Sequence, residues 1–472
     1  MLFNSLHFVA FFIIVCSVYF LLPHKHRWLW LLLSSCYFYM VFLPIYILIL
    51  GSTIVVDYFA GILIEKNTGR KRKMYLVMSL VANIGVLAVF KYYNFLNQNI
   101  SVLLNSVGYH NTIPNLSILL PVGLSFHTFQ AMSYTIEVYR GNQKPERHFG
   151  IYALYVMFFP QLVAGPIERP QNVIHQFYEK HNFDYYRIVE GLKMMLIGYI
   201  KKLVIADRLS IYVNAVYNNP DKHSAVTIVV ATIFFGFQIY CDFSAYSEIA
   251  LGTAKILGID LMVNFRRPYF AKSIQEFWSR WHISLSTWFR DYLYIPLGGN
   301  RVTVARWCLN IFIVFMVSGL WHGASWTFVI WGALHGVYSV CGILFKKTKL
   351  GVFSESNVFA RIISNIFVFG LVCFAWIFFR ANSIHDALLL CSRLFKLKSG
   401  ELFIGLPSTF FYCILSIVVL LIFEYAQEYN LKPVLIFNSK KVAVRYVGYS
   451  LAIIVIVLFA VFNGGQFIYF QF

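Results

Sequence analysis

Long apolar runs separated by short polar connections follow one another along the whole chain. Runs of about 20 apolar residues can cross the hydrocarbon of a bilayer as α-helices, whose backbone polar groups are satisfied internally. The pattern therefore predicts an all-α polytopic membrane protein with roughly 11 to 13 spanning or re-entrant helices. The predicted segments are 6–22, 28–43, 45–64, 74–92, 117–137, 149–166, 188–215, 224–258, 303–320, 324–346, 359–380, 407–427 and 443–463.

The stretch 266–301 interrupts this pattern, because it is too polar to span a bilayer and too aromatic to be a simple loop. Its residues Trp278, Trp281, Leu285 and Trp288 recur at helical spacing and form one apolar stripe. The stripe predicts an amphipathic helix that lies at the membrane interface or dips into it. Tryptophans that simply anchor the protein at headgroup depth are the plainer interpretation. The proline and glycine turn that follows (IPLGGNR) suits a re-entrant path.

No linker, low-complexity block or internal repeat divides the sequence, so we expect residues 1–472 to form one domain that includes the interfacial or re-entrant segment 266–301. The absence of paired half-sequences weighs against transporter folds that are built on repeats. The eight cysteines lie mostly within apolar runs and show no metal-ligand spacing. We therefore expect buried apolar cysteines and no metal site.

The formal net charge of +19 comes largely from Lys and Arg in the short connections. The clearest cluster is residues 65–73 (EKNTGRKRK), which the positive-inside rule places in the cytoplasm. Three predicted spans precede it, so the N-terminus is expected outside, and the basic stretch 25–27 then falls inside as well. A nucleic-acid partner is not expected, because no soluble basic module is available to carry it.

Residues 318–324 (SGLWHGA) place His322 at the end of an apolar run. An ionisable side chain at membrane depth is costly, which makes it a functional-site candidate, and histidine suits proton transfer. The alternative for His322 is a buried structural histidine that a neighbouring carbonyl satisfies. For His335 we expect only a packed histidine. His282 is 40 residues before His322, and one turn and one apolar span link them. The two imidazoles can meet if the first segment enters the bilayer.

Six motifs, in this order, resemble the membrane-bound O-acyltransferase family, and within it the bacterial branch that acetylates polysaccharides such as alginate. They are PVGLSF (121–126), FPQLVAGPI (159–167), DFSAY (242–246), QEFWSRWHISLS (275–286), DYLYIPLGG (291–299) and SGLWHGA (318–324). The resemblance covers most of the chain and implies tilted helices around a central funnel, with the catalytic histidine at a constriction. His322 matches the family's near-invariant histidine, and His282 matches the second polar residue of the pair.

Acyl transfer from a thioester to a hydroxyl requires removal of the hydroxyl proton as the oxygen attacks. A neutral imidazole in an apolar site can act as that general base, which is the role expected of His322. The tetrahedral oxyanion needs hydrogen-bond donors, for which the Trp321 indole and the Gly323 amide are candidates. Further candidates for binding the substrate or the oxyanion are Trp281, Arg280 and Asp291.

Residues 464–472 (GGQFIYFQF) form an uncharged aromatic tail. Anchoring of its rings at the membrane interface is the plainer interpretation. The alternative is that Tyr469 enters the active-site region and carries the acyl group as a transient phenolic ester, which is a better acyl donor than an alkyl ester. Similar aromatic tails end many members of the branch that the chain resembles.

The expected function is transfer of an acyl group, preferably acetyl, from a cytoplasmic thioester toward hydroxyls of an extracytoplasmic polysaccharide. The donor would be acetyl-CoA or another acyl thioester, and no permanently bound cofactor is expected. Expected partners are membrane lipid, the donor, the polysaccharide and, as the family implies, a separate SGNH-hydrolase-like acyltransferase. The expected location is the bacterial inner (cytoplasmic) membrane. A glycan or lipid flippase or a proton-coupled transporter is the alternative, while D-alanyl transfer to teichoic acid stays within the same family.

Overall fold

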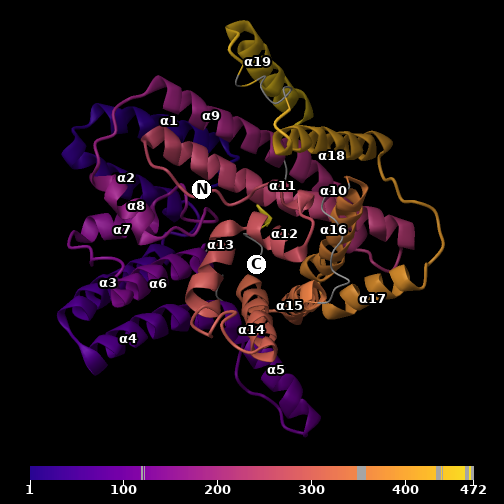
Figure 1. Ribbon diagram of the computed structural model, residues 1–472, viewed down its shortest axis with the longest axis horizontal. Coiled ribbons are helices and arrows are strands. Elements are labelled where there is room, and N and C mark those ends of the chain that lie inside the picture. The colour runs from indigo at the N-terminus through magenta and orange to yellow at the C-terminus, as the bar shows by residue number, and fades with distance from the viewer. Residues whose placement is uncertain are drawn as a thin grey trace. The chain divides into compact units, whose positions relative to one another are not determined.

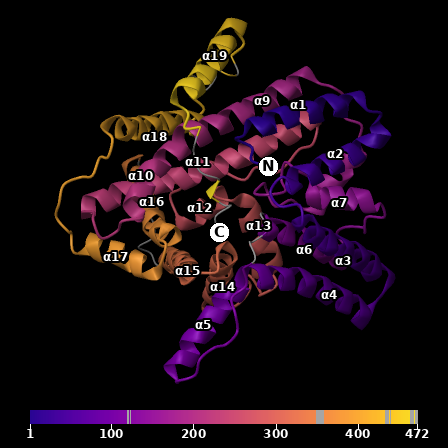
Figure 2. The ribbon, with the colours of Figure 1, turned by 180° about the vertical axis from the view of Figure 1, so that it is seen from behind.

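The structure, a computed structural model, describes residues 1–117, 121, 123–347, 358–431, 437, 439–462 and 467–468. All regular secondary structure in these ranges is helical, which confirms the predicted all-α class (Figures 1 and 2). The α-helices are α1 (Leu6–Leu21), α2 (His24–Met40), α3 (Tyr46–Lys66), α4 (Gly69–Leu87), α5 (Tyr93–Ser106), α6 (Leu124–Arg140), α7 (Phe149–Met157), α8 (Pro170–Val173), α9 (Tyr185–Tyr199), α10 (Asp207–Tyr217), α11 (Ala225–Leu257), α12 (Ile274–Arg280), α13 (Ile283–Phe289), α14 (Val304–His322), α15 (Trp326–Lys347), α16 (Val358–Arg380), α17 (Ile384–Phe395), α18 (Pro407–Glu428) and α19 (Val442–Phe459). Short π-helical or 3-10 turns occupy Ala88–Tyr92, Ile174–Tyr178, Ile200–Ala206, Pro268–Phe270 and Arg290–Tyr294.

Eight helical segments of the described chain are long and apolar enough to cross a membrane, which confirms a multi-pass membrane protein. They are Tyr46–Lys66, Gly69–Ser106, Ala225–Leu257, Val304–His322, Trp326–Phe345, Phe359–Arg380, Pro407–Glu428 and Val442–Phe459. Several other predicted segments form shorter helices. For example, α7 ends at Met157 because the chain turns at Phe158, two residues before Pro160.

The fourth predicted segment continues well beyond Tyr92, through a π-helical turn into α5. The sequence after Tyr92 is rich in asparagine and therefore resembles a loop. In the structure Asn94 donates to the Leu116 carbonyl oxygen at 2.8 Å, and Asn97 donates to the Ile113 carbonyl oxygen at 3.0 Å. The side chains of these asparagines bind the loop that follows α5. Their polar groups are therefore satisfied while their backbone stays helical.

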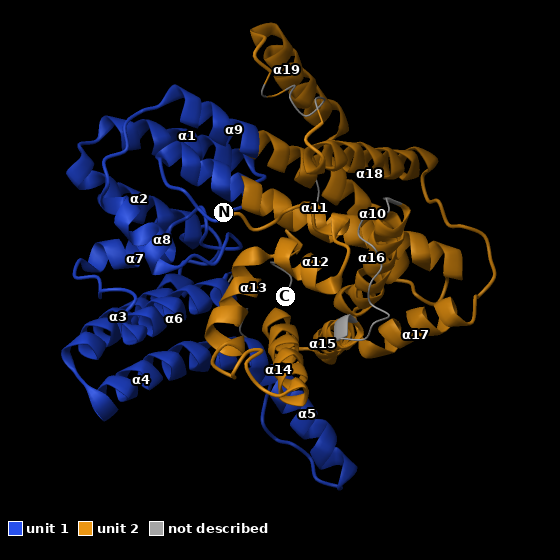
Figure 3. Ribbon diagram, in the orientation of Figure 1, with its two compact units in different colours: residues 1–194, 249–262 blue, residues 195–248, 263–472 orange. Residues whose placement is uncertain are grey.

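The chain forms two compact units, between which the sequence shows no boundary (Figure 3). Unit 1 comprises Met1–Met194 and Ile249–Met262. In this unit α3, α4 and α6 pack together around the fully buried Asp57. The Ser79 hydroxyl donates to Asp57 at 2.6 Å and the Asn83 amide donates at 2.9 Å. These bonds satisfy a carboxyl group that would otherwise be costly to bury.

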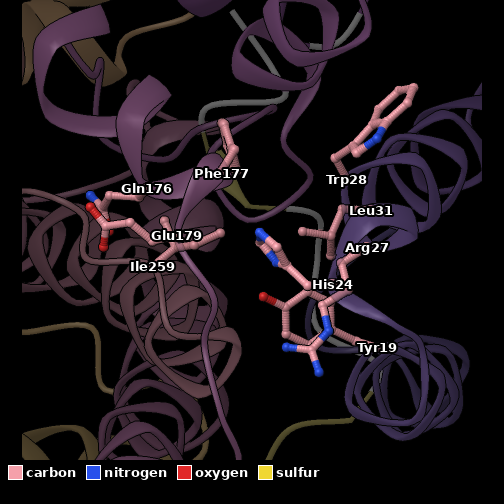
Figure 4. Close-up of a pocket in the computed structure, with 9 residues that line it drawn as sticks. All are labelled: Tyr19, His24, Arg27, Trp28, Leu31, Gln176, Phe177, Glu179 and Ile259. Atoms are coloured by element: carbon pink, nitrogen blue, oxygen red, sulfur yellow. The ribbon is translucent and has the colours of Figure 1, made fainter.

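Arg27, in the first turn of α2, is one of the residues that line a small pocket in unit 1 (Figure 4). The guanidinium donates to the carbonyl oxygens of Leu22 and His181, at 3.0 and 2.5 Å, and lies over the Tyr19 ring at 4.8 Å. The side chain is buried. The charge of Arg27, one of the basic residues in 25–27, is therefore satisfied inside the protein. Its hydrogen bonds also hold the beginning of α2 in place.

Unit 2 comprises Met195–Glu248 and Val263–Phe472. Three fully buried tryptophans, Trp281, Trp331 and Trp376, form the centre of its aromatic core. The Trp376 ring lies 5.2 Å from that of Trp281 and 5.9 Å from that of Trp331, measured between centroids. The core therefore joins the end of α12 to α15 and α16. It adjoins two histidines, because Trp281 precedes His282 and Trp331 packs against His322.

The prediction of one amphipathic helix within 266–301 is wrong, because α12 and α13 are separate short helices. The chain is extended at Trp281, and His282 adopts a left-handed conformation. Trp281 and Trp288 are buried inside the protein, at 1% and 6% exposure, so anchoring at the membrane interface does not account for them. The break separates α12 from α13 and leaves His282 at the junction.

Candidate functional site

His322 is the last residue of α14 and is buried at 5% exposure. Its imidazole packs edge-on against the Trp321 and Trp331 rings, at 4.9 Å between centroids in each case, and against Phe379 at 5.4 Å. Aromatic side chains from α14, α15 and α16 therefore enclose the imidazole. The imidazole is thus held among three aromatic rings at the end of α14.

The structure brings His282 and His322 to the same tryptophan. The His282 ring lies 6.2 Å from the Trp321 ring, and the His322 ring lies 4.9 Å from it. Trp321 is itself buried, at 4% exposure. Trp321 thus connects two histidines that are 40 residues apart in the sequence.

A hydrogen-bond network defines which nitrogen of His282 carries the proton. Asn264 Oδ1 accepts from the Ser284 amide at 3.2 Å, so this atom is the amide oxygen of the asparagine. The same oxygen lies 3.1 Å from His282 Nδ1, which must therefore donate to it. The Nε2 atom of His282 then carries the lone pair.

His282 lies between α12 and α13, outside the eight candidate spans. Burial lowers the pKa of its imidazole to about 3, so the ring is neutral at neutral pH. Two backbone bonds hold the junction: the Ile283 amide donates to the Asn264 carbonyl oxygen, and the Arg266 amide donates to the Arg280 carbonyl oxygen, both at 2.9 Å. His282 itself has φ of 44°, a conformation that costs about 1–3 kcal/mol for a residue with a side chain and is concentrated at functional sites.

Two facing glycines set the contact between α14 and α15, which lie side by side (Figures 1 and 2). A Cβ atom on Gly319 would lie 2.4 Å from the Phe328 carbonyl oxygen, and one on Gly332 would lie 2.4 Å from the Phe315 carbonyl oxygen. Only residues without a side chain allow the two backbones to approach this closely. Because Gly319 is three residues before His322, the contact also fixes the position of the catalytic candidate.

The other candidates of the sequence analysis have different surroundings. The Gly323 amide donates to the Gly319 carbonyl oxygen at 3.4 Å, a long bond at the end of α14. Arg280 binds the carboxylates of Glu276 and Glu428, at 2.7 and 2.9 Å. Trp281 belongs to the aromatic core, and Arg290 forms an ion pair with Asp291 at 2.8 Å. Tyr469 lies outside the described residues.

Sequence reasoning missed Asn264, Ser284 and Phe379 as neighbours of the two histidines. Ser284 is two residues after His282, so the local sequence contained a usable signal for it. Asn264 and Phe379 reach the histidines only through the fold.

The chain belongs to the membrane-bound O-acyltransferase family, whose model matches residues 148–384, and it is an O-acyltransferase. It is 36% identical over 388 residues to the peptidoglycan O-acetyltransferase of Helicobacter pylori, a match that covers 76% of this chain and 72% of that protein. It is 35% identical over 411 residues to the probable alginate O-acetylase AlgI of Pseudomonas aeruginosa, covering 85% and 76%. The teichoic acid D-alanyltransferase of Bacillus subtilis is 28% identical over 278 residues, covering 56% and 69%. Family membership favours the acyltransferase over the flippase or transporter alternative.

Proposed function

We propose that this enzyme transfers an acetyl group from a cytoplasmic acyl thioester, such as acetyl-CoA, toward hydroxyls of an extracytoplasmic polysaccharide. The observation that carries the proposal is the enclosure of the buried His322 by Trp321, Trp331 and Phe379. The similarity to proteins named for the O-acetylation of peptidoglycan and alginate supports a polysaccharide as the acceptor.

In the proposed reaction His322 accepts the proton of the attacking hydroxyl while its oxygen bonds to the thioester carbonyl carbon. The tetrahedral intermediate collapses with cleavage of the carbon–sulfur bond, and the thiolate leaves and takes up the proton. The Trp321 indole N–H is the proposed donor to the oxyanion. We assign His282 a positioning role, because it packs near Trp321 as a neutral imidazole whose Nδ1 is fixed by Asn264.

We propose that the Tyr469 hydroxyl is the first attacking group and carries the acetyl group as a phenolic ester. A hydroxyl of the next acceptor then attacks the ester carbonyl carbon, the bond to the phenolic oxygen breaks, and that oxygen takes up the proton of the attacking hydroxyl. A separate SGNH-hydrolase-like acyltransferase would complete the transfer outside. The proposed location is the bacterial inner membrane with the N-terminus extracytoplasmic, because the basic residues 70–73 then face the cytoplasm.

Radiolabelled acetyl-CoA supplied to the cytoplasmic face of membranes tests the proposal. Label would be followed into the protein and into polysaccharide for the wild type, His322→Gln and Tyr469→Phe. His335→Gln is a matched control, because the His335 ring also packs against Trp331, at 4.9 Å between centroids. His335 belongs to α15, whereas His322 ends α14. The proposal expects loss of transfer in the first two variants and retained transfer in the control, with all four proteins eluting as folded species in detergent.

Transfer that persists in His322→Gln would overturn the assignment of the base. Normal transfer in Tyr469→Phe would remove the relay but leave the base in place. Histidine-dependent proton-coupled flux without any acyl label would favour the transporter alternative.

A further inference from the structure

A buried group of three charged side chains in unit 2 takes no part in the chemical steps proposed for acyl transfer. Lys202 Nζ lies 2.8 Å from Asp207 Oδ1 and 2.7 Å from Asp242 Oδ1. All three residues are at most 3% exposed, on Ile200–Ala206, α10 and α11. Burying such a group is costly and seldom stabilises a fold, which raises the question of what else it does.

The C-terminal segment of the chain binds to this group. The Ile468 amide donates to Asp242 Oδ2 at 2.5 Å, while Oδ1 of the same carboxylate faces Lys202. The Phe467 ring lies 4.4 Å from Lys202 Nζ and packs edge-on against Tyr246 at 5.1 Å. Phe467 and Ile468 are 1% and 5% exposed. The contacts are thus a backbone hydrogen bond to a carboxylate and a cation–π interaction, both in a buried setting.

The chain just after α19 is attached to the same part of unit 2. The Val461 amide donates to the Leu203 carbonyl oxygen at 2.9 Å, and the Arg208 guanidinium donates to the Phe459 carbonyl oxygen at 2.7 Å. Residues 202–208 therefore contact the C-terminal part of the chain at two places. Leu203 and Arg208 bind the backbone near residue 460, and Lys202 contacts the Phe467 ring.

The helix that binds the tail also contacts the candidate site. Phe243 follows Asp242 in α11, and its ring packs edge-on against the His282 imidazole at 4.7 Å. The carboxylate that holds Ile468 is thus one residue from a contact of His282. Tyr469 is the next residue in the sequence after Ile468.

We infer that Lys202 and Asp242 form a docking site for the chain's own C-terminal segment, with Asp242 as a positioning residue. Its carboxylate holds the Ile468 amide, and Lys202 orients that carboxylate and contacts the Phe467 ring. The effect of docking on acyl transfer rests on the proposed Tyr469 relay, whereas the docking itself does not. Detaching the segment should expose Phe467 and, through the relay, slow acyl transfer.

The test introduces Phe467→Cys in the full-length protein and measures the rate of maleimide labelling. Mass spectrometry of the C-terminal peptide separates this label from label on the exposed native Cys341. Adding Ile468→Pro removes the amide hydrogen that Asp242 accepts, whereas Ile468→Ala keeps it. We expect Ile468→Pro to label about tenfold faster or more, because a hydrogen bond to an ionised group changes an equilibrium by at least that factor.

Two substitutions in α11 provide the second comparison. Asp242→Ala removes the acceptor, and Glu248→Gln weakens the neighbouring Lys201–Glu248 ion pair, whose Nζ–Oε1 distance is 2.6 Å. We expect faster labelling only for Asp242→Ala. Equal labelling rates for Ile468→Pro and Ile468→Ala would overturn the docking site, even if Asp242→Ala fails to fold.

Acyl transfer in the same membranes separates this inference from the proposed function. If docking and relay both hold, Ile468→Pro lowers transfer and Ile468→Ala does not. If Tyr469→Phe transfers normally while Ile468→Pro still labels faster, the relay is wrong and the docking site stands.

Discussion

The contact between Gly319 and Gly332 predicts that one added methyl group will damage the site from a distance. In Gly332→Ala the new Cβ would lie 2.4 Å from the Phe315 carbonyl oxygen, whereas ordinary van der Waals contact begins at 3.4 Å. The two backbones must therefore separate by about 1 Å, and α14 carries His322 at its end. A displacement of about 1 Å of a catalytic group costs on the order of 100-fold in rate. We expect kcat/KM for acetyl transfer to fall by about that factor.

The assay is the initial rate of label transfer from acetyl-CoA in membranes that contain equal amounts of folded protein. Overpacking should also lower the free energy of unfolding by about 1–3 kcal/mol, partly offset by the higher helix propensity of alanine. Gly342→Ala is the control, because Gly342 lies in the same helix with no atom within 4 Å of an added Cβ. We expect it to retain full activity. Full activity in Gly332→Ala as well would refute the argument that the glycine contact sets the position of His322.

Two further predictions concern His282. Asn264→Leu leaves the His282 Nδ1–H and the Ser284 N–H without their acceptor, so the free energy of unfolding should fall by about 2–6 kcal/mol. Ser247→Ala removes only the hydroxyl to which Asn264 Nδ2 donates at 3.2 Å and should lose less, and equal losses in thermal unfolding would contradict the network. The lowered pKa of His282, about 3 against an ordinary 6.5, means that the unfolded chain takes up a proton that the folded chain excludes. Stability from this residue is therefore present at neutral pH and is lost as pH falls below 6.5, by about 2 kcal/mol at pH 5. The difference in unfolding free energy between wild type and His282→Gln, measured at pH 7 and pH 5 in detergent, should shrink by that amount, and an unchanged difference contradicts it.

Much of the fold could be predicted because apolar length alone defines a membrane helix. The predicted segments 224–258 and 303–320 agree closely with Ala225–Leu257 and Val304–His322. Length and hydropathy fail where side chains satisfy distant backbone groups. The asparagines of α5 resemble a loop sequence because nothing local shows that they bind the chain near residue 113.

The candidate site could be predicted only in part, for a similar reason. His322 and His282 are marked by local motifs, but the break between α12 and α13 is not. The spacing of Trp278 and Trp281 fits a continuous helix, and the chain departs from it because Asn264 and Arg266 bind the backbone of the junction. Asn264 is 18 residues before His282, and periodicity gives no information about such a contact.

The hairpin of α14 and α15 has a consequence for how the protein is made. Only Gly323, Ala324 and Ser325 separate the two helices, and their contact at Gly319 and Gly332 lies close to this turn. Contacts between residues near in sequence form quickly, because little chain entropy is lost in closing the loop. We expect the two helices to pair as soon as both have left the ribosome and to enter the bilayer together. Two of the three rings around the catalytic candidate, Trp321 and Trp331, would then be in place before α16 is synthesised with the third, Phe379.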